Sequence, residues 1–210
     1  MIKILIADDH AIVRKGLTEI ISDETDMKVS YEAKNAEEVI ELIRDKEIDI
    51  IILDINMPGK SGLDILKDLR FLKPDIPVLI LSINPEDQFA RRCLRAGASG
   101  YMNKDIEPDE FISAIRKIIK GQKYISASLA EKLLIEAESK QKTLVPHDQL
   151  SDREFEVLRM IAGNKTITEI AISMSLSIKT ISTYKSRIFK KLNFSSKEDL
   201  VGYVSRYELV

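Results

Sequence analysis

Short apolar runs alternate with longer stretches of helical periodicity over the first 120 residues. The runs predict five strands, at 2–8, 27–33, 48–54, 76–82 and 99–104. Helical periodicity between them is clearest over 36–47, 62–73 and 108–120. Strands rich in Ile, Leu and Val that alternate with helices predict an α/β domain, in which helices cover both faces of a parallel sheet.

The pattern changes after Gly121. Residues 125–141 predict one polar helix with a thin apolar stripe, made of Leu129, Leu133, Leu134 and Ala137. A tether with Pro146 follows it, and no strand pattern recurs after Leu150. Four helical segments with short breaks are expected there, at 151–163, 166–174, 177–192 and 196–207. We expect an α/β domain at 1–120, a linker with a helix at 121–149 and an all-α four-helix domain at 150–210.

Composition narrows the class of protein. A length of 210 residues suits two domains, each able to bury a core. The only cysteine, Cys93, excludes an intrachain disulfide and a Cys-rich zinc site, and its helical spacing from Phe89 favours a small core residue over a reactive thiol. The sequence has no apolar run long enough to span a membrane and no signal-peptide core, so we expect a cytoplasmic protein without a membrane partner.

Charge is distributed unevenly around the net value of −2. Residues 1–144 carry four more acidic than basic side chains, whereas residues 145–210 carry two more basic than acidic ones. Five cations and no acid lie between Lys179 and Lys191. Such a run is typical of a solvated helix face as well as of a nucleic-acid contact, and the charge alone leaves both open.

Carboxylates follow two of the predicted strands at their carboxyl ends. Asp8 and Asp9 close the first strand and Asp54 closes the third, while Ser82 and Lys104 end the fourth and fifth. These ends meet at one edge of a parallel sheet, where clustered carboxylates favour Mg²⁺. The metal and Lys104 suit a phosphoryl group, with Asp54 as the nucleophile and Ser82 as a donor. Any one of these residues alone would be an ordinary loop residue, and an Asp would be an ordinary helix cap.

Residues 1–120 resemble a two-component receiver domain, which has a flavodoxin-like, doubly wound five-stranded parallel sheet. The resemblance rests on Asp8-Asp9, Asp54, Met57-Pro58, Gly62, Ser82, Tyr101 and Lys104. It implies that Asp54 accepts phosphate from a sensor histidine kinase and that the acidic pair, Asp54 and the backbone carbonyl of Asn56 hold Mg²⁺. It also implies that Ser82 and Tyr101 form a switch pair. We interpret His10 as the start of a helix rather than as a metal ligand.

The C-terminal third predicts a helix-turn-helix. A short helix with Ile167, Ile170 and Ala171 precedes a turn at Ser175-Leu176, and Ser177 is placed to cap a second helix. On that helix Ile181, Ile188 and Leu192 should face inward, which leaves Lys179, Ser182, Thr183, Lys185 and Ser186 outward. Hydroxyls among cations suit a helix in the DNA major groove, and the pattern suits a solvated amphipathic helix equally well.

Residues 150–207 resemble the LuxR/NarL-type DNA-binding domain. The motifs are Leu150-Ser151-x-Arg153-Glu154-x-Glu156-Val157-Leu158, Glu169-Ile170-Ala171, Ser177-x-Lys179-Thr180-Ile181 and Lys190-Lys191-Leu192. By that register Ser182, Thr183 and Ser186 would read bases, with Lys179, Lys185 and Lys190 near phosphates, and the last helix would dimerise. Asn164, Ile167 and Tyr184 depart from the usual Gly, Asn and His, so the target sequence stays open.

Together the two resemblances imply a DNA-binding response regulator of the NarL/FixJ family, with a histidine kinase, double-stranded promoter DNA and a second copy of the chain as partners. RNA polymerase is a further candidate partner. On phosphorylation Ser82 would move toward the phosphoryl group and Tyr101 would turn inward, which would free or pair the DNA-binding domains.

Two other functions stay open. One is an Mg²⁺-dependent phosphotransferase or phosphatase, although such enzymes want a carboxylate where the chain has Asn56. The other is a DNA-binding protein whose receiver is never phosphorylated.

Overall fold

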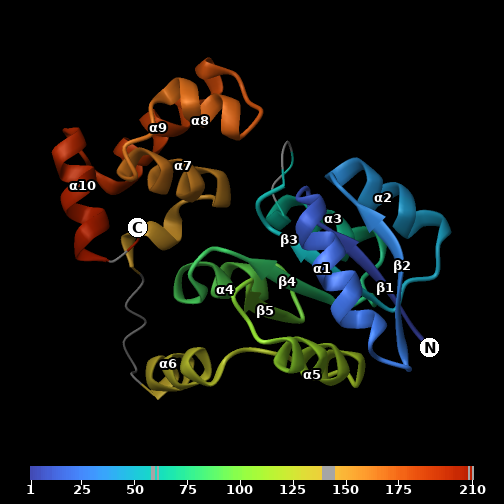
Figure 1. The fold of residues 1–210 in the computed structure, drawn as a ribbon. Helices are drawn as coiled ribbons and strands as arrows, with labels where there is room; N and C mark the ends of the chain where they lie inside the picture. Colours follow the sequence, from blue (N-terminus) through green and yellow to red (C-terminus); the bar gives the residue numbers. More distant parts are fainter. Residues whose placement is uncertain (58–59, 61, 139–144, 208, 210) are drawn as a thin grey trace. The chain divides into compact units, whose positions relative to one another are not determined.

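The computed structural model describes residues 1–57, 60, 62–138, 145–207 and 209 of the chain (Figure 1). The chain divides into two compact units, Met1–Glu138 and Ser139–Val210. Pro58 of the predicted receiver motif lies outside the described residues, as do residues 139–144 of the predicted linker.

A parallel sheet of five strands forms the centre of the first unit, as the sequence predicts. The strands are β1 (Ile2–Ala7), β2 (Met27–Ala33), β3 (Ile50–Asp54), β4 (Val78–Ser82) and β5 (Gly100–Asn103). Their spatial order is β2-β1-β3-β4-β5. The order of the chain therefore reverses between β1 and β3, and a doubly wound sheet binds its ligands beside the carboxyl ends of the strands at such a point.

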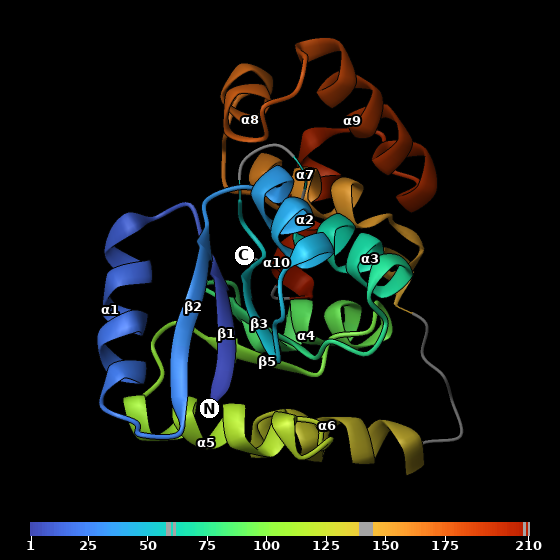
Figure 2. The same ribbon diagram turned by 90° about the vertical axis from the view of Figure 1, so that its right-hand side faces the viewer.

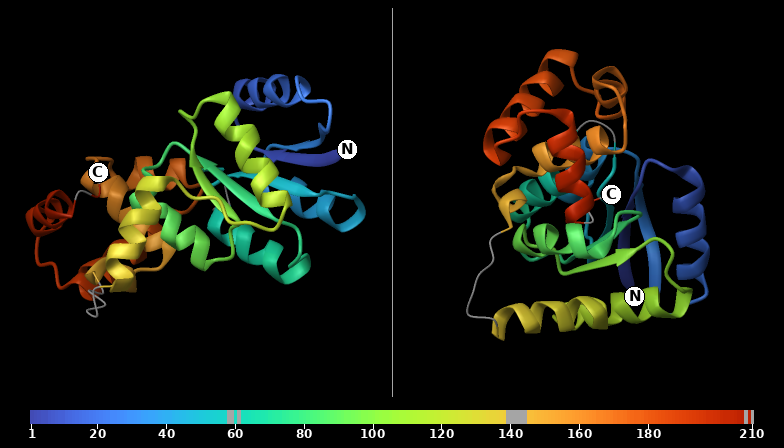
Figure 3. Two further views of the ribbon diagram at one scale, coloured as in Figure 1. Left: turned by 90° about the horizontal axis from the view of Figure 1, so that it is seen from below. Right: turned by 90° about the vertical axis from the view of Figure 1, so that its left-hand side faces the viewer.

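Five helices cover the sheet on both faces. They are α1 (Ala11–Ser22), α2 (Ala36–Asp45), α3 (Gly62–Leu72), α4 (Glu86–Arg95) and α5 (Pro108–Ile119). Helices α1 and α5 lie on one face, and α2, α3 and α4 lie on the other (Figures 2 and 3). Because side chains alternate along a strand, Ile4 and Ile6 of β1 pack toward α1 and α5 while Leu5 points to the opposite face. All three side chains are fully buried.

Local signals in the sequence set where these helices begin. The Asn35 side chain accepts a hydrogen bond from the Glu38 amide at 2.9 Å and so caps α2. Pro108 opens α5, where its missing N–H is not needed. The buried face of α5 then brings Phe111 and Ile115 onto the sheet, and full burial of each such side chain contributes about 1.5–3 kcal/mol.

The segment after α5 is attached to the first unit. Tyr124 pairs with the edge of β5 through Tyr124 N–H to Ser99 O (2.9 Å) and Tyr101 N–H to Tyr124 O (3.2 Å). Helix α6 (Ala127–Glu138) follows, and Leu129 at its start is buried. Our placement of Leu134 in the apolar stripe is wrong, because its side chain is 64% exposed. Five residues turn a helix by about 140° beyond a full turn, away from the Leu129 side.

The second unit contains the four predicted helices. A 3-10 turn, η1 (Pro146–Gln149), precedes α7 (Asp152–Ala162), α8 (Ile167–Ser173), α9 (Ile178–Leu192) and α10 (Lys197–Arg206). Asn164 and Ser175 adopt left-handed backbone conformations, with φ of 61° and 54°, at the turns before α8 and α9. The residue that replaces the usual glycine, Asn164, thus takes the conformation expected of it.

The structure also bears on the expected roles of Cys93 and of membrane-spanning segments. Cys93 is fully buried on α4, as expected of a core residue. Within the described part of the chain, no helix combines the length and apolar character that a membrane crossing needs.

Candidate functional site

Asp8, Asp54 and Lys104 meet at the carboxyl edge of the sheet. Lys104 Nζ lies 2.6 Å from Asp8 Oδ2 and 2.9 Å from Asp54 Oδ2. Both carboxylates are only 2% exposed. Lys104 follows β5, whose end is held beside β4 by a hydrogen bond from the Lys104 amide to the Ser82 carbonyl (2.9 Å). The predicted cluster is therefore brought together by the ends of β1, β3 and β5.

Burial raises the pKa of the Asp54 carboxyl, and the neighbouring Asp8 charge acts in the same direction. The Asn56 amide, which donates to Asp54 Oδ1 at 3.0 Å, and the Lys104 ammonium oppose this shift. Burial also works against the charge of Lys104, but its hydrogen bonds to Asp8 and Asp54 outweigh that effect and raise its pKa. The Lys104 ammonium and the two carboxylates thus stabilise one another's charges, whereas the two carboxylates repel each other.

Asp9 and His10 lie beside Asp8 and Asp54 and complete a cluster of possible metal ligands. Ligand atoms of Asp8, Asp9, His10 and Asp54 all lie within 4.8 Å of one another, close enough for one metal ion. Among the described residues, Asp9 Oδ1 is buried and has no hydrogen-bond partner, and His10 Nδ1 lies 2.9 Å from it. His10 is also the N-cap of α1, as its interpretation as a helix-start residue requires, although its ring makes no cap hydrogen bond. Carboxylate oxygens gathered this closely fit a hard divalent cation.

Gly62 allows the loop after β3 to return to the pocket. A Cβ at this position would lie 2.4 Å from Ile55 Cα and 2.9 Å from Asp54 O, so only glycine fits. The Gly62 amide donates to the Ile55 carbonyl at 3.0 Å. This close approach gives the Gly of the predicted motif a structural reason, since it holds Ile55, the residue between Asp54 and Asn56.

A polar chain connects Ser82 with Tyr101. Ser82 is fully buried, and its Oγ accepts the Asn84 amide at 3.0 Å. Tyr101 is also fully buried, and its hydroxyl donates to the Asn84 carbonyl at 2.9 Å. Tyr101 is already inside in this conformation, so the expected inward turn of its ring is not needed here. Asn84, which joins the two, was missed from the sequence because neither spacing nor residue type distinguishes it from a loop residue.

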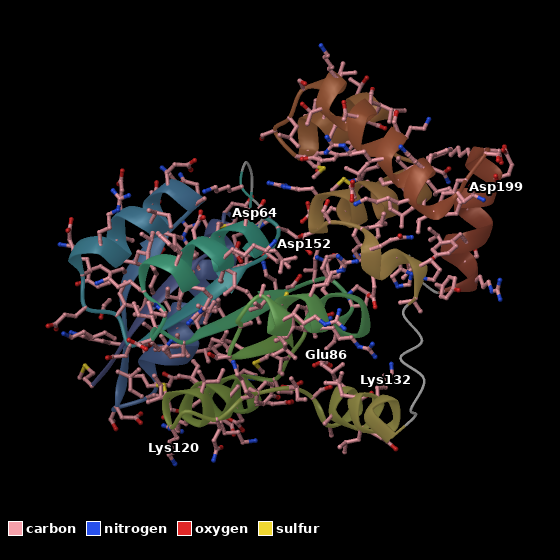
Figure 4. The ribbon with its side chains drawn as sticks, turned by 180° about the vertical axis from the view of Figure 1, so that it is seen from behind. Asp64, Glu86, Lys120, Lys132, Asp152 and Asp199 are labelled. Atoms are coloured by element: carbon pink, nitrogen blue, oxygen red, sulfur yellow. The ribbon has the colours of Figure 1, made fainter. Side chains whose placement is uncertain are left out.

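Glu86, the first residue of α4, links this helix to the start of α6. Its carboxylate accepts hydrogen bonds from the backbone N–H (3.2 Å) and the hydroxyl of Ser126. Ser126 Oγ in turn accepts the Leu129 amide at 3.1 Å, in the first turn of α6. Glu86 is labelled in Figure 4. No sequence signal joins residues 86 and 126, because only the fold brings them together.

In the second unit, α9 presents the residues expected on its outer face. Lys179, Ser182, Thr183, Ser186 and Lys190 are exposed, and Lys185 is partly so. The expected inward residues Ile181 and Ile188 are fully buried, while Leu192 is partly buried. The Ser177 side chain caps the helix by accepting the Thr180 amide at 3.0 Å. A helix with a cationic, hydroxyl-bearing outer face is therefore fixed by its apolar face.

An ion pair with a buried carboxylate holds α9 against α7. Lys191 Nζ lies 2.6 Å from Glu154 Oε2, and the Glu154 side chain is 3% exposed. Glu154 also accepts the Ser151 amide at 2.7 Å as part of the capping box of α7. Both adjacent lysines are exposed, and Lys191 is the one whose ammonium is held by Glu154.

Family models match both units. Residues 4–116 match the response regulator receiver domain, and residues 148–204 match the bacterial regulatory proteins of the luxR family. The chain is 37% identical over 210 residues to the response regulator GacA of Pseudomonas aeruginosa, covering all of this chain and 98% of that protein. It is 32% identical over 209 residues to the response regulator UvrY of Escherichia coli, covering all of this chain and 96% of that protein.

Solved structures of RcsB are similar over nearly the whole chain. RcsB of Salmonella enterica serovar Typhimurium, bound to the promoter rprA in the presence of phosphomimetic BeF₃⁻, has a TM-score of 0.68 at 26% identity and covers 98% of this chain and 99% of that one. A structure of two RcsB dimers bound to two parallel DNAs has a TM-score of 0.60 at 27% identity, covering 97% and 98%.

The buried Glu154 makes the stability of the second unit depend on pH. Burial alone would raise the pKa of Glu154, but its hydrogen bonds to Lys191 and Ser151 outweigh burial and lower it below the usual 4.5. Stability from this group is then present above pH 4.5 and is lost as the pH falls through the lower, folded-state pKa. Glu154→Gln should cost about 2 kcal/mol at pH 7 and much less in acid.

Urea titrations of the full chain at pH 7 and in acid, followed through the methyl NMR signals of Ile161 and Ile188, measure this difference. Glu198→Gln, which removes an exposed carboxylate from α10, is the control. A pH dependence equally steep in Glu154→Gln and wild type would contradict the assignment.

Proposed function

Because the chain belongs to the two-component response regulators with a LuxR-type DNA-binding domain, we propose that Asp54 is its phosphoryl acceptor and that a sensor histidine kinase is the donor. Proteins of this family are transcription factors rather than turnover enzymes. The observation that carries the proposal is the pairing of Lys104 with both Asp8 and Asp54 in a buried pocket.

In the proposed reaction a carboxylate oxygen of Asp54 attacks the phosphorus of a phosphohistidine. The P–N bond breaks, the imidazole leaves with the bond's electron pair and takes up a proton, and an acyl phosphate forms on Asp54. The Lys104 ammonium lies beside the acceptor carboxylate and can neutralise phosphoryl oxygens. The Ser82 hydroxyl is a donor that can reach the phosphoryl group once the loop after β4 moves.

Mg²⁺ is the proposed cofactor. Asp8, Asp9, Asp54 and the backbone carbonyl of Asn56 would hold it, and the close grouping of the three carboxylates supports this ligand set. When bound, the ion supplies positive charge that offsets the charge of the phosphoryl oxygens during transfer. The chain's own residues position the acceptor, since the Asn56 amide holds one oxygen of Asp54 and Lys104 holds the other.

Phosphorylation would act on the second unit through the loop after β4. Ser82, Asn84 and Tyr101 form one hydrogen-bonded chain, and Glu86, the first residue of α4 after this loop, holds Ser126 at the start of α6. A shift of Ser82 toward the phosphoryl group would break the Asn84 contact and loosen the hold on α6. A coupling of about 1–3 kcal/mol between the two sites is enough for regulation.

The second unit would then bind promoter DNA as a dimer. Ser182, Thr183 and Ser186 are the proposed base contacts, Lys179, Lys185 and Lys190 are the proposed phosphate contacts, and α10 is the proposed dimer element. The exposure of these α9 residues supports this assignment, as does the binding of RcsB dimers to DNA. Contact with RNA polymerase at the promoter is a further proposal. Because the target is chromosomal DNA, we assign the protein to the cytoplasm.

Wild-type protein should gain one phosphate from acetyl phosphate and Mg²⁺, and Asp54→Asn should gain none, because the amide that replaces the acceptor carboxylate cannot attack phosphorus. Intact-mass spectrometry detects the acid-stable, base-labile adduct. In a gel shift the wild type should bind promoter DNA roughly five- to 150-fold more tightly once phosphorylated. An adduct on Asp54→Asn would contradict the assignment of Asp54 as the acceptor. An unchanged DNA affinity of phosphorylated wild type would contradict the coupling between phosphorylation and DNA binding.

Glu86→Gln should expose α6 without affecting phosphorylation, because it weakens the charge-assisted bonds to Ser126 and leaves the pocket intact. Hydrogen exchange of residues 126–134 should rise in unphosphorylated Glu86→Gln to the level of the phosphorylated wild type. Glu107→Gln, which changes an exposed carboxylate before α5, is the matched control. If exchange in α6 is the same in Glu86→Gln and wild type, Glu86 does not carry the signal.

A further inference from the structure

The hydroxyl groups on the outer face of α9 are already hydrogen-bond donors to their own helix. Thr183 Oγ1 donates to the Lys179 carbonyl at 2.9 Å, and Ser186 Oγ donates to the Ser182 carbonyl at 3.0 Å. Both side chains are exposed. A hydroxyl has one hydrogen and two lone pairs, so each of these oxygens offers only acceptor sites to a ligand on the outer face.

The three proposed base-contact positions carry no side chain that forms the strong paired hydrogen bonds of sequence readers. Arg and Lys recognise guanine through two acceptors, and Asn and Gln recognise adenine through a donor and an acceptor. Ser182, Thr183 and Ser186 have neither arrangement. These positions therefore present the acceptor oxygens of Thr183 and Ser186, the methyl group of Thr183 and the hydroxyl of Ser182.

We propose that Thr183 and Ser186 read DNA as hydrogen-bond acceptors. In the major groove the donors are the exocyclic amino groups, N6 of adenine and N4 of cytosine. The Thr183 methyl is suited to the C5-methyl group of thymine. The proposal rests on the proposed placement of α9 on DNA, and it adds which base edges this chain selects and which it does not.

The surrounding charges are consistent with hydroxyls that contact bases and cations that contact phosphates. Lys179 and Lys190 are exposed on the same helix, and a cation is suited to phosphate oxygens. The side chain of Lys191 is 38% exposed, and its ammonium is paired with Glu154. The acceptor oxygens thus lie among cations that fix the helix on the backbone, while the short hydroxyls supply the base contacts.

The probe is the duplex that the phosphorylated full-length wild type recovers from a randomised pool. Adenines in each half-site are replaced one at a time by purine, which lacks the 6-amino group, and by 7-deazaadenine, which lacks the N7 acceptor. Cytosines are replaced by 2-pyrimidinone, which lacks the 4-amino group. Because loss of an amino group also weakens the base pair, the quantity compared is the loss of affinity in wild type relative to that in variants.

At one or two positions, amino-group removal should weaken wild-type binding roughly three- to tenfold more than it weakens Ser186→Ala or Thr183→Val. Thr183→Ser keeps the oxygen and should keep the amino-group dependence, while it should lose the preference for thymine over uracil. Replacement by 7-deazaadenine should affect wild type and variants equally.

A loss on 7-deaza substitution that disappears in Ser186→Ala or Thr183→Val would overturn the inference, because the hydroxyls would then be donors. Equal responses of wild type and both variants to every analogue would overturn it as well. Lys179→Gln distinguishes the acceptor role of the hydroxyls from the placement of α9 on DNA. If it weakens binding to all duplexes while the hydroxyl variants change nothing, only the acceptor reading fails. If neither kind of variant changes binding, the placement of α9 on DNA fails with it.

Discussion

The contact of one ammonium group with two buried carboxylates determines the architecture of the pocket. Asp8 and Asp54 end neighbouring strands and would repel each other at 2% exposure, so the sheet tolerates them only with a cation beside them. Lys104 supplies that charge from the far edge of the sheet. Its position depends on β5 and on the hydrogen bond from its amide to the Ser82 carbonyl. This bond connects the pocket to Ser82 and so to the chain that reaches Tyr101.

The second unit uses the same device for another purpose. The buried Glu154 carboxylate pairs with Lys191 and joins α7 to α9, so the orientation of the outer face of α9 depends on this pair. Replacement of Lys191 would leave the buried Glu154 charge uncompensated. In each unit, then, a charged side chain that the sequence alone would place at the surface lies inside, because it pairs with an opposite charge from a distant part of the chain.

The periodic features were predictable from the sequence. All five strands and the four C-terminal helices follow from hydrophobic spacing, and Asp8, Asp54 and Lys104 follow from their places at strand ends. Asn84 and the Glu86–Ser126 contact did not, because they depend on where loops meet across the fold. The prediction for Leu134 was wrong because the apolar residues of α6 span a wider arc than the helix buries. The inward position of the Tyr101 side chain is one of two conformations, and no sequence pattern selects between them.

The central claim is that the pocket at the ends of β1 and β3 binds a divalent cation through Asp8, Asp9 and Asp54. Mn²⁺ prefers the same oxygen ligands as Mg²⁺ and broadens nearby NMR signals. Titration of the full chain should broaden the amide signals of residues 8–10 and 54–56 before any others, with roughly tenfold weaker affinity in Asp9→Asn. Broadening that is scattered over the exposed carboxylates, or identical in Asp9→Asn, would contradict the claim.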